Sequence, residues 1–466
     1  MAGKHKDPGQ TNGHRGEHAA EMHGAEGAAA RPLDTPLVIL GARLVDGTGG
    51  DPIEDAALVI EGDRIRAAGQ RDRVRMPHGA RVVDTGDATI LPGLIDCHVH
   101  LANEWGYNLL RTLMTPPSLK LLYCVPNCRV TLEGGITTVR DAGYTPAAVK
   151  QAVERGLFPG PRMLVAVTIL SQTGGHGDAM MPCCVDFGSA FGPGPSDVPH
   201  GVVDGAEEMR HKVREVLRAG ADWVKLCTSG GVLSAADAPT SPQFTVEEIA
   251  VAVYEAAAQE KRCMAHAQST QGIKNALRAG IASIEHGIYL DDEAIDMMKQ
   301  RGVYLVPTLV APQDVITLAE SRPGLMPAYA IDKAREVIGA HRESFRKAVQ
   351  AGVKIAMGTD SGVGPHGENA RELPLMVAHG MTPMQAIVAS TRSAAELLHL
   401  DGQVGTLAAG KLADVLVVAG DPLAEIETVA DPARRALVLK GGVPVAGHLL
   451  TAPALRERAP ATLAAR

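Results

Sequence analysis

Six polar residues that could form one metal site, five of them of types that bind metal ions, stand at intervals along the middle of this 466-residue chain. Four are histidines, one is an aspartate and one is a lysine: His98, His100, His266, His286, Asp360 and Lys225. Imidazole and carboxylate groups suit zinc and other first-row divalent ions. Together these residues would support metal-assisted chemistry, in which a bound cation activates water or polarises a carbonyl group.

Each of these residues also has a structural explanation. A single histidine at the end of a strand is commonly a core or loop residue, and Lys225, beside Trp223, could point from a strand to solvent. Asp360, in the sequence GTDSG, could cap a helix or form a turn. The combination is more specific than its members, because the six residues are placed at the carboxyl ends of five different predicted strands.

The elements that would position these residues are short apolar runs alternating with amphipathic segments between residues 91 and 404. Segments 205–220, 245–261 and 270–280 carry apolar residues at three- and four-residue steps, which predicts helices. The strand candidates are 94–99, 137–141, 163–169, 223–227, 263–267, 282–286, 303–307 and 354–358.

Eight strands, each followed by a helix or loop, predict an α/β fold of the (β/α)8 TIM barrel type. An open, doubly wound sheet is the alternative. It would need a glycine-rich phosphate loop after the first strand, and DCHVHLANEW has no such character. In a barrel, catalytic groups lie at the carboxyl ends of the strands. The two-residue period of a strand puts His98 and His100 on one face, so both imidazoles could reach a single ion.

The sequence pattern at both ends of the chain differs from that of the middle. Residues 35–90 and 405–450 contain short apolar runs separated by Gly, Asp and Pro turns, which predicts a small β-sandwich domain formed by the two segments together. Residues 1–34 are rich in Gly, Ala, His and charge without periodicity, and we expect a disordered tail there and a second tail at 451–466.

The composition excludes several classes of partner. The formal net charge is −8 at pH 7 and no run of lysine and arginine occurs, whereas nucleic-acid binding needs a clustered basic surface. No stretch approaches the roughly 20 apolar residues that span a bilayer. Residues 1–32 lack the apolar core of a secretory signal. We therefore expect a cytoplasmic protein with neither nucleic acid nor membrane as a partner.

Seven cysteines agree with this localisation, because they are odd in number and lack the spacing of a disulfide framework. They form two clusters, Cys124 with Cys128 and Cys183 with Cys184. A structural zinc or a disulfide is one interpretation of these clusters. We expect free, buried or half-buried thiols instead.

Several segments resemble the amidohydrolase superfamily, in the branch of imidazolonepropionase-like enzymes, prolidase-like dipeptidases and ochratoxinase-type amidases. The segments are LPGLIDCHVH, DWVKLCTSGGVLS, MAHAQS, SIEHG and MGTDSGVGPHGENARELPLMV, and the resemblance runs from about residue 37 to residue 447. Imidazolonepropionase itself uses one metal and lacks the lysine, so the resemblance disfavours that activity here.

The resemblance implies a binuclear centre with two divalent ions, zinc by preference, with manganese and cobalt as alternatives. His98, His100 and Asp360 would hold the more buried ion, and His266 and His286 the second. CO2 would convert Lys225 to a carbamate, which removes the positive charge and supplies two oxygens that bridge the ions. Homo-oligomers are common in this branch, and a small molecule is the expected substrate.

The implied activity is hydrolysis of an amide C–N bond in an N-acyl amino acid or dipeptide-like substrate. A metal-bridging hydroxide would attack the carbonyl carbon, and Asp360 would carry a proton to the leaving amine. An alternative keeps the same metals but cleaves a carbamate, urea, lactam or lactone. A different class of protein, a non-catalytic scaffold paralogue, would be expected to have lost metal ligands.

Candidate substrate contacts follow several of the predicted strands. His176 lies in the glycine-rich sequence SQTGGHGD, and a histidine there contacts the substrate carbonyl in relatives of this branch. Dipeptidase relatives can carry a tyrosine at the position of Gln268, which puts dipeptide specificity in question. Arg140 is a candidate for binding a substrate carboxylate. The full set of predicted substrate-binding residues is His176, Ser229, Gly230, Gln268, Tyr289 and His366.

Overall fold

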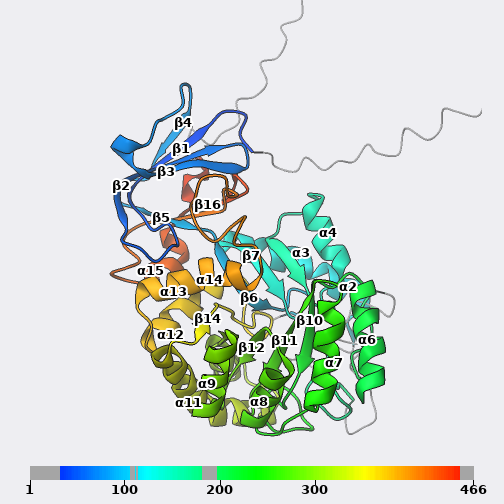
Figure 1. Ribbon diagram of the computed structural model, residues 1–466. Helices are drawn as coiled ribbons and strands as arrows, with labels where there is room; N and C mark the ends of the chain where they lie inside the picture. The colour runs from blue at the N-terminus through cyan, green and yellow to red at the C-terminus, as the bar shows by residue number, and fades with distance from the viewer. Residues whose placement is uncertain (1–31, 105–110, 112–113, 181–196, 452–466) are drawn as a thin grey trace, which may run out of the picture.

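The computed structural model describes residues 32–104, 111, 114–180 and 197–451. Nearly all of the two predicted tails, and the pair Cys183 and Cys184, lie outside these residues. Within the described residues, a β-sheet layer lies at one end of a larger α/β body (Figure 1).

The β-sheet layer is built from strands of both ends of the chain. It is an eight-stranded sheet with the order β17-β16-β15-β5-β1-β2-β3, and β4 also pairs with β1. The junction of the two segments is the antiparallel pair β15–β5, where Val417 lies opposite Ile90. The strands are β1 (Leu37–Leu44), β2 (Ile53–Glu61), β3 (Arg64–Gln70), β4 (Arg81–Asp84), β5 (Thr89–Pro92), β15 (Val415–Val418), β16 (Arg435–Lys440) and β17 (Val443–Ala446).

This layer is one hydrogen-bonded sheet that divides at β1, whereas the sequence predicted a sandwich. Residues 37–40 of β1 pair with β4, while residues 43–44 pair with β5. Leu37 and Ile39 belong to one apolar cluster, and Val38 and Leu40 belong to another. Strand β1 therefore packs on both faces, which explains its continuous apolar sequence.

The α/β body contains parallel strands in two sheets, so the predicted α/β class is confirmed. One sheet has three strands in the order β6-β7-β8, and the other has six in the order β14-β13-β12-β11-β10-β9. The strands are β6 (Leu94–Val99), β7 (Ile136–Asp141), β8 (Arg162–Val165), β9 (Ile169–Leu170), β10 (Trp223–Cys227), β11 (Arg262–Ala267), β12 (Ser283–His286), β13 (Tyr304–Val306) and β14 (Lys354–Ile355).

Among the described strands, no continuous ladder closes the two sheets into a single barrel. The predicted strand 163–169 is interrupted because Val167 has φ 65°, a left-handed conformation that a regular strand cannot contain, and this break separates β8 from β9. At the opposite edge, Cys97 N donates to Met357 O at 2.9 Å, and Val99 forms a parallel bridge with Ser361. The chain after β14 thus runs beside β6.

Helices lie outside the strands that they connect (Figure 1). Helix α7 begins with a capping box between Thr245 and Glu248, and α8 ends at Gly280 in the left-handed conformation. The helices are α2 (Pro117–Leu122), α3 (Cys124–Glu133), α4 (Ala147–Glu154), α6 (Ala206–Arg218), α7 (Val246–Ala257), α8 (Thr270–Ala279), α9 (Asp292–Arg301), α10 (Val310–Ser321), α11 (Ala328–Ala351), α12 (Glu372–Ala378), α13 (Pro383–Ala389), α14 (Arg392–Leu397) and α15 (Glu427–Ala430).

The sequence analysis also gave expectations about membrane-spanning segments and about the cysteines. None of the helices in the described part of the chain is both long and apolar enough to cross a membrane. Cys124 and Cys128 are free, buried thiols on α3, as predicted.

Replacing Leu437 by Ala should lower the free energy of unfolding by about 2–5 kcal/mol, because the side chain is completely buried in the layer shared by both chain ends. Urea denaturation of the two proteins would measure the difference. Val82→Ala is the matched control: Val82 is 46% exposed on β4, so its loss should change stability by about 0.5 kcal/mol or less. Equal effects of the two changes would contradict the role of β16 in the core.

Candidate metal centre

Strand β6 leads into two histidines whose imidazoles face the same side, as the strand period predicted. Their ring centroids are 5.4 Å apart. His98 donates from Nδ1 to Glu285 Oε2 at 2.7 Å, and His100 donates from Nδ1 to Gly143 O at 3.2 Å. Because both acceptors lack a proton to give, each histidine carries a proton on Nδ1, and its Nε2 faces the centre.

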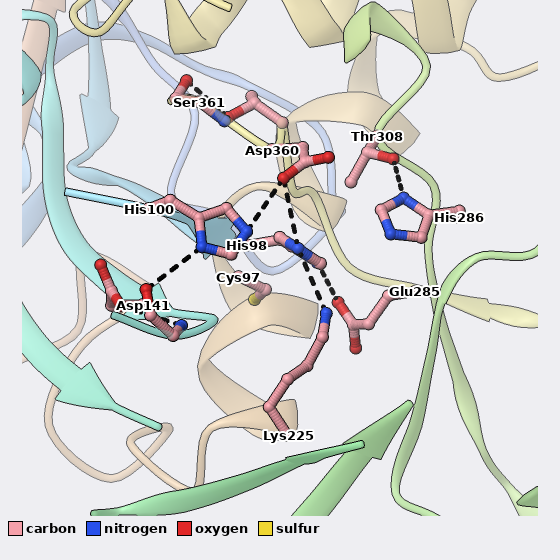
Figure 2. Close-up of polar contacts among 12 residues, drawn as sticks. Cys97, His98, His100, Asp141, Lys225, Glu285, His286, Thr308, Asp360 and Ser361 are labelled. Carbon is pink, nitrogen blue, oxygen red and sulfur yellow. Dashed lines mark hydrogen bonds and ion pairs between the residues drawn. The ribbon is translucent and has the colours of Figure 1, made fainter. Parts of the chain in front are cut away.

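Asp360 lies between these two Nε2 atoms (Figure 2). Its Oδ1 is 3.1 Å from His100 Nε2 and 3.5 Å from His98 Nε2. The residue has φ 63°, and its amide donates to His98 O at 2.7 Å, so a left-handed turn holds the carboxylate at this position. Although burial raises the pKa of this carboxyl group, the hydrogen bond from protonated His100 Nε2 outweighs it and keeps the pKa of Asp360 well below its usual range, and the same contact raises the pKa of His100. Asp360 is therefore ionised.

Lys225 reaches the same point from the opposite side. It lies in the middle of β10 rather than at its end, and the length of its side chain brings Nζ to 3.4 Å from His98 Nε2 (Figure 2). The residue is only 2% exposed. Burial lowers the pKa of Lys225, which favours the neutral amine over the ammonium form.

The remaining predicted ligands complete a ring of imidazoles. The His286 centroid is 5.1 Å from that of His98 and 4.7 Å from that of His266. His176, on the loop after β9, stacks on His266 with centroids 4.1 Å apart. His286 Nδ1 and Thr308 Oγ1 are 2.7 Å apart, and both residues have positive φ, which turns their side chains toward the centre.

This donor set fits divalent cations. The ligand atoms of His98, His286 and Asp360 lie within 4.8 Å of one another. Burial holds the pKa of His98, His266 and His286 well below the usual value, so these imidazoles are neutral and have the lone pairs that a metal ion requires. The structure thus brings together all six residues that the sequence singled out.

Glu285 is a buried carboxylate that the sequence analysis missed. It is fully buried and accepts hydrogen bonds from His98 Nδ1 at 2.7 Å and from Arg140 at 2.8 Å. Alternation along a strand would place Glu285 and His286 on opposite faces, but φ 71° at His286 turns the chain so that both side chains reach the centre. A glutamate inside the predicted buried strand ASIEH was the available signal.

Two further buried aspartates fix the loops of the centre. Asp96 accepts from the His98 amide at 3.0 Å and from the Thr359 hydroxyl at 2.6 Å, which joins β6 to the loop that carries Asp360. Asp141 accepts from the Leu101 amide at 2.7 Å. Burial raises the pKa of Asp96 to about 6. Asp96, in the strand LIDCHV, gave the same signal as Glu285, whereas Asp141 ends the polar strand sequence ITTVRD.

Two cavities meet at this centre. The larger has a volume of about 600 Å³ and is lined by His98, Lys225 and Asp360 on one side and by α2 and the loops after β9 and β10 on the others. The smaller has a volume of about 50 Å³ and is lined mainly by apolar side chains. His176, His266 and Asp360 line both cavities. A volume of several hundred Å³ is typical of sites for small molecules.

Three of the predicted substrate contacts line these cavities. His176 donates from Nδ1 to Ser234 Oγ at 2.8 Å, and Ser234 donates onward to Asp237. Burial lowers the pKa of His176 to about 4. His366 lines the larger cavity, and its Nε2 donates to a backbone carbonyl, while Gln268 lines the smaller one. The Gln268 Oε1 atom is buried and has no hydrogen-bond donor among the described residues.

The other three predicted contacts lie outside the lining of both cavities. The Ser229 hydroxyl accepts a hydrogen bond from the backbone amide of Gln268 at 2.7 Å, so it serves a contact between loops. A Cβ atom on Gly230 would lie 2.2 Å from Ala238 O, so this glycine serves close backbone packing. Tyr289 packs in an apolar cluster beside the smaller cavity.

Two glycines of the loop after β10, Gly230 and Gly231, contact histidines of the centre. The Gly230 carbonyl accepts a hydrogen bond from His266 Nε2 at 3.1 Å, and a metal bound at that nitrogen would take its place. A Cβ atom on Gly231 would lie 2.3 Å from the His176 ring, so only glycine leaves room for His176 to stack on His266.

The interpretation of Arg140 as a carboxylate-binding residue was wrong. The side chain is completely buried and lines neither cavity. Its guanidinium donates to Cys97 O, Ser283 and Glu285, and lies 4.6 Å from the ring centroid of Trp223. Arg140 is the counter-ion of Glu285.

Comparison with known proteins gives concordant matches. The family model described as Amidohydrolase family matches residues 89–445. Ochratoxinase of Aspergillus niger is 34% identical over 420 residues, which cover 88% of this chain and 86% of that enzyme. A solved Xaa-Pro dipeptidase with methionine in its active site has a TM-score of 0.80 at 32% identity, covering 88% of this chain and 99% of the other. A prolidase solved with N-methylphosphonate-L-proline has a TM-score of 0.79 at 35% identity, with the same coverage.

Replacing Glu285 by Gln should lower the free energy of unfolding by about 3–5 kcal/mol, because it leaves the buried Arg140 charge without its anion. Urea denaturation followed by tryptophan fluorescence would measure this loss. The double change Arg140→Met with Glu285→Gln should recover part of it. Glu293→Gln is the control, since Glu293 is 59% exposed in its ion pair and its loss should cost about 1 kcal/mol or less. A Glu285→Gln protein as stable as the control would contradict the assignment.

Proposed function

Because this chain belongs to the amidohydrolase family and is a hydrolase, we propose that it cleaves the amide bond of an N-acyl amino acid or dipeptide-like substrate at a centre of two divalent metal ions. The names of its relatives support an amide substrate, since they include an ochratoxinase and a Xaa-Pro dipeptidase. We further infer that the two parallel sheets are parts of one (β/α)8 barrel, as in the family.

The observation that carries this proposal is the place of Lys225. Its amine lies in a nearly dry pocket, 3.4 Å from His98 Nε2, with its pKa lowered by burial. A neutral amine is a nucleophile, and an ammonium ion is not. Its nitrogen can therefore form a bond to the carbon of CO2 and release a proton, which yields an anionic carbamate.

The proposed ligands divide into two groups. His98, His100 and Asp360 would hold one ion, His266 and His286 the other, and the carbamate on Lys225 would bridge them. Zinc suits these nitrogen and oxygen donors, as do manganese and cobalt. When bound, such ions lower the pKa of water and polarise a carbonyl group.

The residues of the chain would then control protons and orientation. Asp360 is ionised beside His100, so it can accept a proton from the attacking water and deliver it to the leaving amine. His176 would contact the substrate carbonyl from the cavity wall. Donation to a carbonyl would require a second proton, on Nε2; burial opposes it by lowering the pKa of His176 to about 4, whereas the nearby Asp237 acts in the opposite direction.

Replacing Lys225 by Met removes the amine and keeps an apolar stem of similar length. The variant should bind less metal than the wild type, for which we expect about two ions per chain, because the bridging anion is lost. Elemental analysis after growth with zinc would measure the metal. A wild-type protein in ¹³C-labelled bicarbonate should show one carbamate resonance that is absent from the variant. Lys347→Met, at an exposed lysine of α11, is the control and should keep both signals. Equal metal content in the two variants would contradict the bridge.

The reaction itself is tested with a panel of N-acyl amino acids, dipeptides, carbamates, ureas, lactams and lactones at saturating zinc. We expect the amides to have the highest kcat/KM. Asp360→Asn should lower kcat by about 10²–10⁴-fold while retaining most of the metal, because the shuttle of the proton is lost. Asp332→Asn, at an exposed position of α11, should change neither quantity. Preference for a carbamate, urea or lactone would replace the proposed substrate, and unchanged turnover of Asp360→Asn would exclude the proton role.

A further inference from the structure

The larger cavity contains a lysine whose charge has no counter-ion among the described residues. Lys120, on α2, lines this cavity and is only 8% exposed. Its ammonium group forms no hydrogen bond or ion pair with any residue in the described part of the chain. Burial is the one cause that lowers the pKa of Lys120, so no neighbouring carboxylate offsets it.

The acidic groups on the same wall are already engaged. Glu104 is ion-paired with Arg111 at 2.6 Å. Asp178 accepts two backbone amide bonds, from Gly174 at 2.8 Å and from Met180 at 3.0 Å. Asp360 belongs to the centre described above. Lys120 therefore faces a cavity in which no carboxylate of the described wall is left to bind it.

A partly dehydrated ammonium ion has a higher free energy than one in water, and an anion brought into the cavity lowers it again. An ammonium group donates up to three hydrogen bonds and suits a carboxylate as a point charge. The cavity that Lys120 lines is also lined by Asp360 and Lys225 of the metal centre. A single small molecule can therefore contact Lys120 and the metal centre at the same time. The lining of the same cavity includes Tyr123 and Val130, which suit an apolar side chain.

We propose that Lys120 binds the α-carboxylate of an N-acyl amino acid while the scissile amide lies at the metal centre. This inference rests on the proposed function and makes it more specific, because it names the residue that recognises the free carboxylate on the amine half of the substrate. Lys120 therefore has the role in binding the substrate carboxylate that the sequence predicted for Arg140. The residue determines specificity through binding and takes no part in the bond-breaking step.

The test compares N-acetyl-phenylalanine with N-acetyl-phenylalaninamide, two amides that differ only in the α-carboxylate. The wild type should prefer the free acid. Lys120→Met should raise KM for the free acid by about 10- to 100-fold, which corresponds to losing one hydrogen bond between charged groups. It should leave KM for the carboxamide within about twofold and change kcat little, because the metal centre is untouched.

Three controls keep the result specific. Lys120→Arg retains the charge and should preserve most of the preference, and Lys347→Met removes an exposed positive charge and should have no effect. The thermal unfolding curve and the zinc content of each variant show whether it is folded and loaded. A preference for the free acid that survives in folded Lys120→Met, or a wild type indifferent to the carboxylate, would overturn the inference.

A binding measurement separates this inference from the proposed reaction. Calorimetric titration of the metal-loaded wild type with phenylalanine and with phenylalaninamide measures recognition of the carboxylate without turnover. Tighter binding of phenylalanine that disappears in Lys120→Met would support the role of Lys120 even if no member of the amide panel is hydrolysed. Equal binding of both compounds to the wild type would overturn that role, whatever the panel shows.

Discussion

The structure depends on one electrostatic constraint, the burial of an amine among imidazoles. If Lys225 were an ammonium ion, its charge would only cancel that of Asp360, and the centre would have no net attraction for two dications. Glu285 cannot supply the missing charge, because Arg140 already neutralises it. Burial favours the neutral amine, and a carbamate would then give the centre two negative charges. The geometry is therefore suited to cations only when the lysine has lost its own charge.

Buried carboxylates hold the residues of the centre in place. Asp96 joins the backbone of His98 to the loop before Asp360, and Glu285 fixes the tautomer of His98. Removing either would leave backbone amides or a guanidinium without a partner inside the α/β body, so these groups stabilise the fold and orient the proposed ligands at the same time. Positive φ at His286 and Asp360 is part of this arrangement, because it turns side chains inward where a regular strand would end.

Sequence patterns predicted the parallel α/β body and the six grouped residues, since five of them lie at or near the carboxyl end of a strand and parallel strands present these ends together. Lys225 lies in the middle of β10 and reaches the centre through the length of its side chain. Asp96 and Glu285 were missed, although a carboxylate in an apolar strand was a visible signal. Arg140 was misinterpreted because its counter-ion lies 145 residues further along the chain. The break at Val167 was also invisible, because left-handed φ at a valine depends on its surroundings. Lys120 gave no signal, since a lysine in PPSLKLL suits any exposed helix.

The proposed hydrolytic groups and the residues that line the rest of the cavity lie in different parts of the fold. Strands hold the groups that would perform hydrolysis, whereas the cavity wall that receives the rest of the substrate comes from connecting segments such as α2 and the loop after β9. A metal centre activates many acyl derivatives alike, so discrimination depends on the energy of contacts away from the reacting atoms. A dehydrated cation on that wall is such a contact, because its free energy falls only when an anion arrives. Changes in the connecting segments could therefore redirect specificity while the strands and their ligands stay the same.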